Sequence, residues 1–259
     1  MHLPRLHLPT RRDGRGATPV GVDFGGSGIK GAPVDLAAGK FAADRVRIPT
    51  PQPSTPERVA EVLVDLLAQL PEAEGPVGVT VPGVVRHGVV GSAANIDESW
   101  IGTDADALFS RATGRTVRTV NDADAAGLAE VRFGAARGQS GLVIVTTLGT
   151  GIGSAFVHDG VLVPNSELGH LEVDGANAEA RAANSARERE DLSWEEWAER
   201  LTRYYRTVER LFSPDLIVVG GGVSKHADSF LPLIGIDTPI VPAKLRNKAG
   251  IIGAALYVS

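Results

Sequence analysis

The chain has 259 residues, of which 43% are hydrophobic and 22% are charged, with no cysteine and a net charge of −5 at pH 7. These values are ordinary for a soluble globular protein large enough for one domain or two lobes. The absence of cysteine excludes disulfides and thiolate zinc sites, and the negative net charge disfavours general binding to nucleic acid. No apolar run approaches the roughly 20 residues that a membrane span needs. We therefore expect a cytoplasmic protein.

The first 19 residues lack the continuous apolar segment of a signal peptide, and we expect them to form a flexible leader. Beyond them, runs typical of strands alternate with runs typical of helices. In chain order we expect a strand over 20–26 ending in a glycine turn, a proline-rich loop over 47–56, a helix over 56–70 capped by Thr55 with Pro56 at its first position, a strand over 76–83, a strand and then a helix over 116–134, two strands forming a hairpin over 141–160, helical structure over 177–212, a strand over 215–225 and a helix over 247–258. This alternation predicts an α/β fold with helices on the sheet faces.

Two segments echo each other about half a chain apart. VDFGGSG at 22–28 and TTLGTGI at 146–152 share an apolar strand, a polar and an apolar residue, and then glycine with small residues, at an offset of 124 residues. Such an echo is expected if one strand–turn–strand lobe occurs twice, although so short a match also arises by chance.

The glycine turns of these segments suggest phosphate binding, because successive backbone N–H groups in such a turn form a concavity for anions. In the first turn Ser27 and Lys30 could donate to phosphate, and Asp23 could hold Mg²⁺ through water. The hydroxyls that could serve the second turn are those of Thr147, Thr150 and Ser154. A lone glycine cluster is more often a tight hairpin, but two turns with the triple glycine at 220–222 favour a phosphoryl donor between two lobes.

Three polar residues, Asn121, Asp122 and Asp124, stand where a predicted strand meets a predicted helix. Asn and Asp are preferred N-cap residues, so helix capping alone explains the cluster. Alternatively, one aspartate accepts the proton of an attacking hydroxyl in phosphoryl transfer, and Asn121 holds a neighbouring hydroxyl.

The stretch SELGHLEVDG at 166–175 contains Glu167, His170, Glu172 and Asp174. A metal site is disfavoured, because thiolates are absent and a lone histidine with carboxylates is a weak zinc pattern. Carboxylates can instead accept hydrogen bonds from the hydroxyls of a sugar. Glu172 and Asp174 could equally orient the loop or face water.

Six motifs, GVDFGGSGIKG, TVPGVV, NDADAAG, TTLGTGIGSA, ELGH and IVVGGGVS, follow one another over residues 21–224, within a longer matching stretch of about 19–257. In this order they resemble the ROK family of sugar kinases, and the longer stretches TTLGTGIGSAFVHDGVLVPNSELGHLEVDG and FSPDLIVVGGGVSK are most similar to its polyphosphate glucokinases. The resemblance implies an actin-like ATPase (ribonuclease-H-like) fold with the active site in a cleft between two lobes. We expect a small lobe over 20–120 and a large lobe over 121–259, whose C-terminal helix packs back on the small lobe.

The resemblance also implies the reaction: transfer of a terminal phosphoryl group from polyphosphate, ATP or both to the 6-hydroxyl of glucose, and also of mannose, with Mg²⁺. Asp122 matches the general base. The positions expected at the sugar are Gly83, Asn95, Asn121, Glu167, His170 and Glu179. The positions expected at phosphate or nucleotide are Asp23, Gly25, Gly26, Ser27, Gly28, Lys30, Thr147, Gly149, Thr150, Gly151, Gly221 and Gly222.

One departure from the family concerns zinc. Many ROK members follow this glycine–histidine pair with the cysteine cluster CxCGxxGCxE, whereas LEVDGANAEARAA after His170 has no cysteine, so no structural zinc is expected. Glu179 falls where the glutamate that ends that cluster would stand, which is why we expect it at the sugar.

Polyphosphate is a long polyanion and should need a basic track to the phosphate turns. The candidates are Arg137, Lys225, Lys244, Arg246 and Lys248, each of which could instead be a solvated surface charge.

Three alternatives to a polyphosphate glucokinase remain open. The first is a strictly ATP-dependent hexokinase of the same family. The second is a sugar-sensing regulator, which is disfavoured because the 19 residues before Val20 are too few for the helix-turn-helix of the family's regulators. The third is a nucleotide switch or filament protein of the actin class, which would have no use for the sugar-binding set. The resemblance leaves open whether the chain is a monomer or a homodimer.

Overall fold

The structure is a computed structural model that describes residues 17–70 and 73–259. The predicted leader therefore lies outside the described residues as far as residue 16. Its end is ordered, contrary to the prediction: the carbonyl of Thr18 accepts the amide of Gly75, and that of Pro19 accepts the amide of Val34. Within the described ranges, every helix is too short or too polar to cross a membrane.

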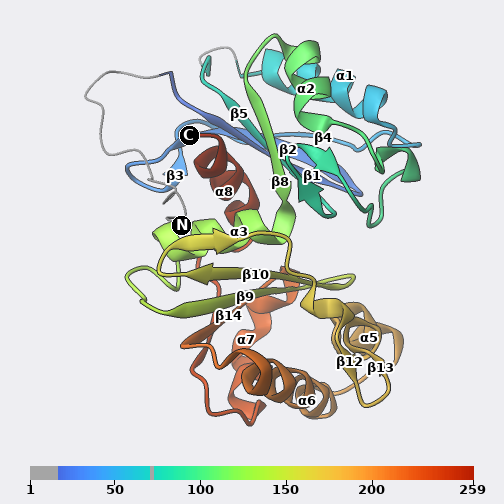
Figure 1. Cartoon of the computed structure of the whole chain (residues 1–259), viewed down its shortest axis with the longest axis vertical. Coiled ribbons are helices and arrows are strands. Elements are labelled where there is room, and N and C mark those ends of the chain that lie inside the picture. The colour runs from blue at the N-terminus through green and yellow to red at the C-terminus, as the bar shows by residue number, and fades with distance from the viewer. Residues whose placement is uncertain (1–16, 71–72) are drawn as a thin grey trace, which may run out of the picture.

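The first sheet forms the upper half of the molecule in Figure 1. Its strand order is β3-β2-β1-β5-β8, and β4 pairs with β2. The strands are β1 (Val20–Gly25), β2 (Gly28–Asp35), β3 (Lys40–Phe41), β4 (Val46–Ile48), β5 (Val77–Val81) and β8 (Val117–Asn121). Helices α1 (Pro56–Ala68) and α2 (Ala105–Thr113) cover one face, while α8 (Ala249–Val258) covers the other.

The second sheet forms the lower half, with the strand order β11-β10-β9-β14-β15. Its strands are β9 (Leu142–Leu148), β10 (Ile152–His158), β11 (Val161–Val163), β14 (Leu216–Gly220) and β15 (Ile240–Pro242). Helix α3 (Asp122–Phe133) packs on β9 and β10 from the side of the first sheet, and α6 (Trp194–Phe212) lies on the opposite face with α7 (Ala227–Phe230).

Smaller elements complete the chain. They are the hairpins β6 (Val85–Arg86) with β7 (Val89–Val90) and β12 (Glu172–Val173) with β13 (Ala176–Asn177), the helices α4 (Ala178–Ala182) and α5 (Asn184–Arg189), and the 3-10 turns η1 (Glu98–Trp100), η2 (Leu168–His170), η3 (Gly222–His226), η4 (Leu231–Leu233) and η5 (Arg246–Lys248).

The two sheets repeat the same pairing pattern. β1 runs antiparallel to β2 and parallel to β5, and β9 runs antiparallel to β10 and parallel to β14. The hairpins β1–β2 and β9–β10 contain the two echoing segments. The echo therefore corresponds to equivalent places in two similar sheets.

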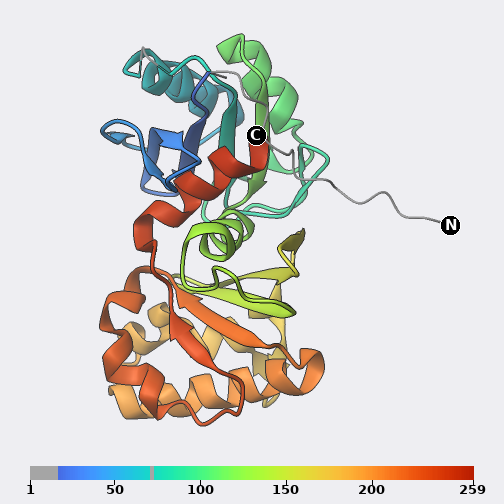
Figure 2. The same cartoon turned by 90° about the vertical axis from the view of Figure 1, so that its left-hand side faces the viewer.

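Helix α8 belongs by sequence to the end of the chain but packs on the first sheet (Figure 2). Three glycines make the contact unusually close: a Cβ atom at Gly21 or Gly78 would overlap the backbone of α8, and one at Gly253 would overlap the carbonyl of Ala125 in α3. Only glycine permits such an approach between backbones. α8 is thus held between the first sheet and α3.

Two local predictions need correction. Thr55 precedes α1, whose first residue is Pro56 as predicted, but its side chain makes no capping hydrogen bond. The helical segment over 177–212 is three helices, because Ala183 has an extended backbone and Asp191 a positive φ. Helix α2 was not predicted, and strand β2, which carries Lys30, was expected only as the second strand of the strand–turn–strand echo.

Candidate active site

The cleft is lined by strand ends from both sheets. β1, β5 and β8 run parallel, so their carboxyl ends meet at one edge of the first sheet. β9 and β14 are also parallel, and their ends meet at an edge of the second. Polar or glycine-rich segments follow these ends, an arrangement typical of ligand sites beside parallel strands.

Asp122 is the first residue of α3, directly after β8, and its side chain is open to the cleft. Although the side chain is exposed, neighbouring protein atoms still desolvate its carboxyl group. This burial, with the negative charges of Asp23 and Glu167, raises the pKa of Asp122 to about 6. A carboxylate with a pKa near neutrality is suited to accept a proton during catalysis.

Asp23 is held at the end of β1 by residues of two neighbouring strands. Its Oδ1 accepts the hydroxyl of Thr80 on β5 at 3.1 Å, and its Oδ2 lies 3.6 Å from the Nζ of Lys30 on β2. The Thr80 hydroxyl also accepts the amide of Phe24. We did not predict Thr80, although it is the one polar residue in the buried run VGVTV and could have been found from that.

The first phosphate turn, Gly25–Gly28, joins β1 to β2. The hydroxyl of Thr50 donates to the Gly25 carbonyl at 2.5 Å. A Cβ atom at Gly26 would lie 2.9 Å from the carbonyl oxygen of Asn95, a residue with a φ of 60°. Asn95, expected at the sugar, therefore supports the phosphate turn through its backbone.

Arg47 was missed as a site residue. It lies on β4, paired in register with Lys30 on β2, and its Nη2 donates to the carbonyl of Ser27 at 3.3 Å. The guanidinium is thus exposed directly beside the turn. The alternation of Val46, Arg47 and Ile48 is a weak strand signal that the loop prediction over 47–56 concealed.

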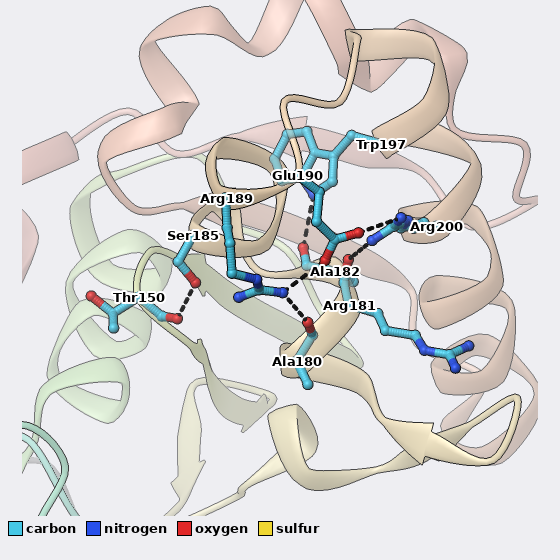
Figure 3. A network of polar contacts seen from close by, with 9 residues as sticks. All are labelled: Thr150, Ala180, Arg181, Ala182, Ser185, Arg189, Glu190, Trp197 and Arg200. Carbon is cyan, nitrogen blue, oxygen red and sulfur yellow. Dashed lines mark hydrogen bonds and ion pairs between the residues drawn. The ribbon is translucent and has the colours of Figure 1, made fainter.

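The second phosphate turn joins β9 to β10, after Thr147 near the end of β9. The amide of Gly149 donates to the carbonyl of Gly151 at 3.0 Å. Ser185, in α5, holds the turn from behind: its amide donates to the Gly149 carbonyl and its hydroxyl to the Thr150 carbonyl at 2.6 Å (Figure 3).

The triple glycine lies against this second turn. Gly221 has a φ of 84°, and a Cβ atom there would overlap the backbone of Leu148. Gly222, which begins η3, is exposed. The structure therefore brings Gly221 and Gly222 to the second phosphate turn.

Three of the residues expected at the sugar, Glu167, His170 and Glu179, lie at η2 or beside it. Glu167 precedes it and His170 ends it. The His170 Nδ1 is 3.6 Å from Oε1 of Glu179 and 3.3 Å from Nδ2 of Asn177. Glu179 Oε2 accepts the amide of Ile152 at 3.2 Å, which places this carboxylate between the second phosphate turn and η2. Burial and the charge of Glu179 raise the pKa of Glu167, and His170 partly opposes this.

Asn121 serves as a helix cap. Its Oδ1 accepts the amides of Ala123 and Asp124 at 2.8 and 3.1 Å, and its Nδ2 donates to the carbonyl of Gly83 at 3.0 Å. One amide hydrogen remains for a ligand. Capping and substrate binding are therefore compatible uses of one side chain.

Ser154 is not part of the second phosphate turn, contrary to the prediction. It is buried, its hydroxyl donates to the Ser166 carbonyl at 2.9 Å, and it accepts the amide of Leu168 at 2.9 Å. It fixes the segment around Glu167. Farther along, Asp174 pairs with Arg203 at 3.2 Å, and Glu172 is exposed on β12.

The basic-track candidates separate into two groups. Arg137 lies beyond the C-terminal end of α3, which spans about 18 Å from Asp122, so the structure does not bring Arg137 to the phosphate turns. The other four are exposed on η3 and around η5, two turns that contact each other: Lys225, Lys244, Arg246 and Lys248. The N-terminus of α8 follows η5, and a Cβ atom at Gly250 would lie 3.2 Å from the Asp23 carboxylate.

A cavity of about 420 Å³ is lined mainly by residues of α4, α6 and the β12–β13 hairpin. Two of its three lining arginines have carboxylate partners: Arg200 contacts Glu190 at 2.7 Å, and Arg203 contacts Asp174. Figure 3 shows Glu190 between Arg189 and Arg200, with Arg189 also donating to the Ala180 carbonyl. These contacts hold α4 and α5 against α6 and so support the second phosphate turn.

Comparison with known proteins gives consistent results. The sequence profile of the ROK family matches residues 19–182. The chain is 52% identical over 237 residues to a polyphosphate glucokinase of Mycobacterium tuberculosis (strain CDC 1551 / Oshkosh), covering 91% of this chain and 89% of that protein. Its fold is similar to that of the inorganic polyphosphate/ATP-glucomannokinase from Arthrobacter sp. strain KM, with a TM-score of 0.89 and 58% identity over 93% of this chain and 98% of the other. A ROK family glucokinase from Streptomyces griseus, in complex with glucose and AMPPNP, matches with a TM-score of 0.78 and 25% identity over 92% and 98% of the two chains.

Proposed function

This chain belongs to the ROK family and has its two-lobed, actin-like ATPase fold, and we propose that it phosphorylates glucose with polyphosphate as the phosphoryl donor. The terminal phosphoryl group is transferred to the 6-hydroxyl of the sugar. The chain's relatives at about half identity or more are named for this reaction, and the predicted family resemblance is confirmed.

One observation carries the assignment: Asp122 faces the cleft between the Asp23 end of the first sheet and the Glu167 segment of the second. The phosphate turns supply backbone N–H groups on the donor side. Glu167, His170 and Glu179 supply hydrogen-bonding groups on the sugar side. Phosphoryl transfer to a sugar requires a base with phosphate-binding groups on one side and polyol-binding groups on the other.

In the reaction, Asp122 accepts the proton of the sugar 6-hydroxyl while the oxygen of that hydroxyl forms a bond to the terminal phosphorus. The bond from that phosphorus to the bridging oxygen breaks, and polyphosphate leaves one unit shorter. Because the transition state is loose, the main task of the chain is to align the hydroxyl with the phosphorus. Lys30 and the two glycine turns hold the phosphate oxygens.

We propose Mg²⁺ as the cofactor, with Asp23 holding it through water. Within the described ranges, no cluster of three or more His, Asp or Glu side chains could hold a metal alone. This fits Mg²⁺, which commonly binds one or two carboxylates together with the phosphates of a substrate. The negative charges of Asp23 and Asp122 repel each other, so a bound cation would offset part of this repulsion and part of the donor's charge.

ATP as a second donor and mannose as a second sugar belong to the same proposal. The Arthrobacter protein, named for polyphosphate and ATP and for both sugars, supports them. Gly221 and Gly222, beside the second turn, are the expected adenosine contacts.

The test is a steady-state comparison of polyphosphate and ATP as donors to glucose on one preparation, with Asp122→Asn as the variant. We expect saturable glucose 6-phosphate formation with polyphosphate, and a loss of kcat of at least about a hundredfold in the variant with glucose binding retained by calorimetry. No product with either donor would refute the kinase assignment. A variant that kept most of its turnover would refute Asp122 as the base.

A further inference from the structure

A buried carboxyl group lies behind the proposed base. Asp124 follows Asp122 by two positions on α3, which turns its side chain about 200° around the helix axis. Asp122 therefore faces the cleft while Asp124, 1% exposed, faces the protein interior. The proposed reaction does not use Asp124.

Asp124 holds the segment that carries the sugar-binding residues. Its Oδ2 accepts the backbone amide of Asn165 at 2.7 Å. Asn165 has a φ of 62°, a left-handed conformation that asparagine tolerates better than most residues, and it lies two residues before Glu167. The hydrogen bond thus ties the start of the Glu167 segment to the helix that begins with Asp122.

Asn165 also reaches the other lobe. Its Oδ1 accepts the amide of Val85 at 2.8 Å, and its Nδ2 donates to the carbonyl of Val85 at 2.9 Å. The side-chain amide thus pairs with β6 of the first half of the chain as a strand residue would. Two residues earlier, the carbonyl of Gly83 accepts the Nδ2 of Asn121.

Asp124 is costly to keep where it is. Its Oδ1 is buried and has no hydrogen-bond partner among residues 17–70 and 73–259. Burial, with a smaller contribution from the carboxylates of Glu167 and Asp122, raises the pKa of Asp124 to about 7, although the hydrogen bond from the Asn165 amide opposes this. An apolar residue of similar size would avoid this cost but could not accept the Asn165 amide, so the hydrogen bond accounts for a side chain with an acceptor oxygen here.

We propose that Asp124 and Asn165 are positioning residues that fix the sugar-binding Glu167 relative to the base Asp122 and to the small lobe. We call the two residues the bracket. The inference rests on the proposed function, because it assigns their role in the same reaction. The bracket sets where the sugar lies and does not touch the donor.

The test uses three variants of the full chain, assayed with glucose and polyphosphate. Asp124→Ala removes the acceptor for the Asn165 amide. Asn165→Gly keeps the left-handed backbone and the amide but removes the pair with Val85. Asp124→Asn retains an acceptor oxygen. We expect the first two variants to raise the KM for glucose about tenfold while the KM for polyphosphate stays within about twofold of the wild-type value. We expect Asp124→Asn to keep the KM for glucose close to the wild-type value.

The matched control is Asp106→Ala. Asp106 also accepts a backbone amide from another element, that of Thr119 at 2.6 Å, but it lies on α2 away from the cleft. We expect the loss of this hydrogen bond in Asp106→Ala to lower the midpoint temperature of unfolding, while the KM values for glucose and polyphosphate stay near those of the wild type. If Asp124→Ala does not fold, Asn165→Gly tests the same inference.

A double-mutant cycle distinguishes positioning from general damage. If the bracket acts through Glu167, the rise in glucose KM caused by Asp124→Ala should shrink to below about twofold in a Glu167→Gln background. If the fold increases in glucose KM of the two single variants simply multiplied in the double variant, the inference would be refuted. An unchanged glucose KM in Asp124→Ala, or an equal rise in its KM for polyphosphate, would also refute it. A wild-type chain that forms no glucose 6-phosphate would instead refute the proposed function itself.

Discussion

Asp122 owes its proposed role to its surroundings. An ordinary aspartate has a pKa near 4, whereas the cleft walls and the charges of Asp23 and Glu167 raise that of Asp122 to about 6. The group is still largely ionised at neutral pH but binds a proton readily, which is the compromise a general base requires.

The pH dependence of glucose phosphorylation should follow this group. The protonated carboxyl cannot accept a proton, so kcat/KM for glucose should be level above about pH 7 and fall about tenfold per unit of pH below 6. Samples returned from the acid buffers to neutral pH should regain full rate, which separates titration from unfolding. A profile that stayed level down to about pH 5 would contradict the assignment.

Arg47 gives a second prediction at this scale. Its guanidinium lies beside the first phosphate turn, and Arg is well suited to phosphate oxygens. Arg47→Ala should raise the KM for polyphosphate about tenfold, and less for ATP, because a longer polyanion can also contact side chains beyond the turn. Arg137→Ala, at the distant end of α3, is the matched control and should change neither value. Equal effects of the two substitutions would show that Arg47 acts only through overall charge.

At the scale of elements, α8 illustrates how packing overrides helix propensity. Replacing a helical glycine by alanine usually stabilises by about 1 kcal/mol. At Gly253 the added Cβ would meet the Ala125 carbonyl of α3, and overpacking costs about 1–3 kcal/mol or more. Gly253→Ala should therefore lower the free energy of unfolding, measured by urea titration.

Gly91→Ala is the control for that substitution, since a Cβ there would have its nearest neighbour at 3.5 Å. We expect it to change the free energy of unfolding by less than about 0.5 kcal/mol. A stabilised Gly253→Ala variant would mean that α3 and α8 separate easily.

The sequence predicted elements where a strong local signal existed. The runs before Gly25 and Gly83 are mostly apolar, and the run before Asp122 alternates valine with polar residues. All three contain β-branched residues, and each is a strand. The breaks within 177–212 were missed because Ala183 has no local signal. The start of α6 did have one: Ser193 and Glu196 form a capping box.

The candidate site was predictable in part. Asp122, Glu167 and the glycine turns stand in motifs, and their placement at strand ends follows from the α/β pattern. Arg47, Thr80 and Asn165 act through partners 20, 57 and 80 residues away. No local pattern reports such distances, so the folded structure is needed to identify these partners, even for Thr80, whose polarity within a buried run was a local signal.

At the scale of the whole molecule, two similar sheets face each other across α3 and α8. α3 packs against the second sheet and contacts α8, and α8 packs against the first (Figures 1 and 2). The proposed base is at the N-terminus of one of these helices, and the N-terminus of the other adjoins Asp23. A relative rotation of the sheets would therefore move the donor and sugar groups with respect to each other.

The packing of α8 also has a consequence for synthesis of the protein in the cell. The first sheet is complete as a set of strands once Asn121 has been made, but the helix that covers its second face begins only at Ala249. At about 5–20 residues per second, the ribosome takes on the order of ten seconds to make the intervening chain. During that interval β1 and β5 present an uncovered face, which makes the nascent chain a candidate client for chaperones.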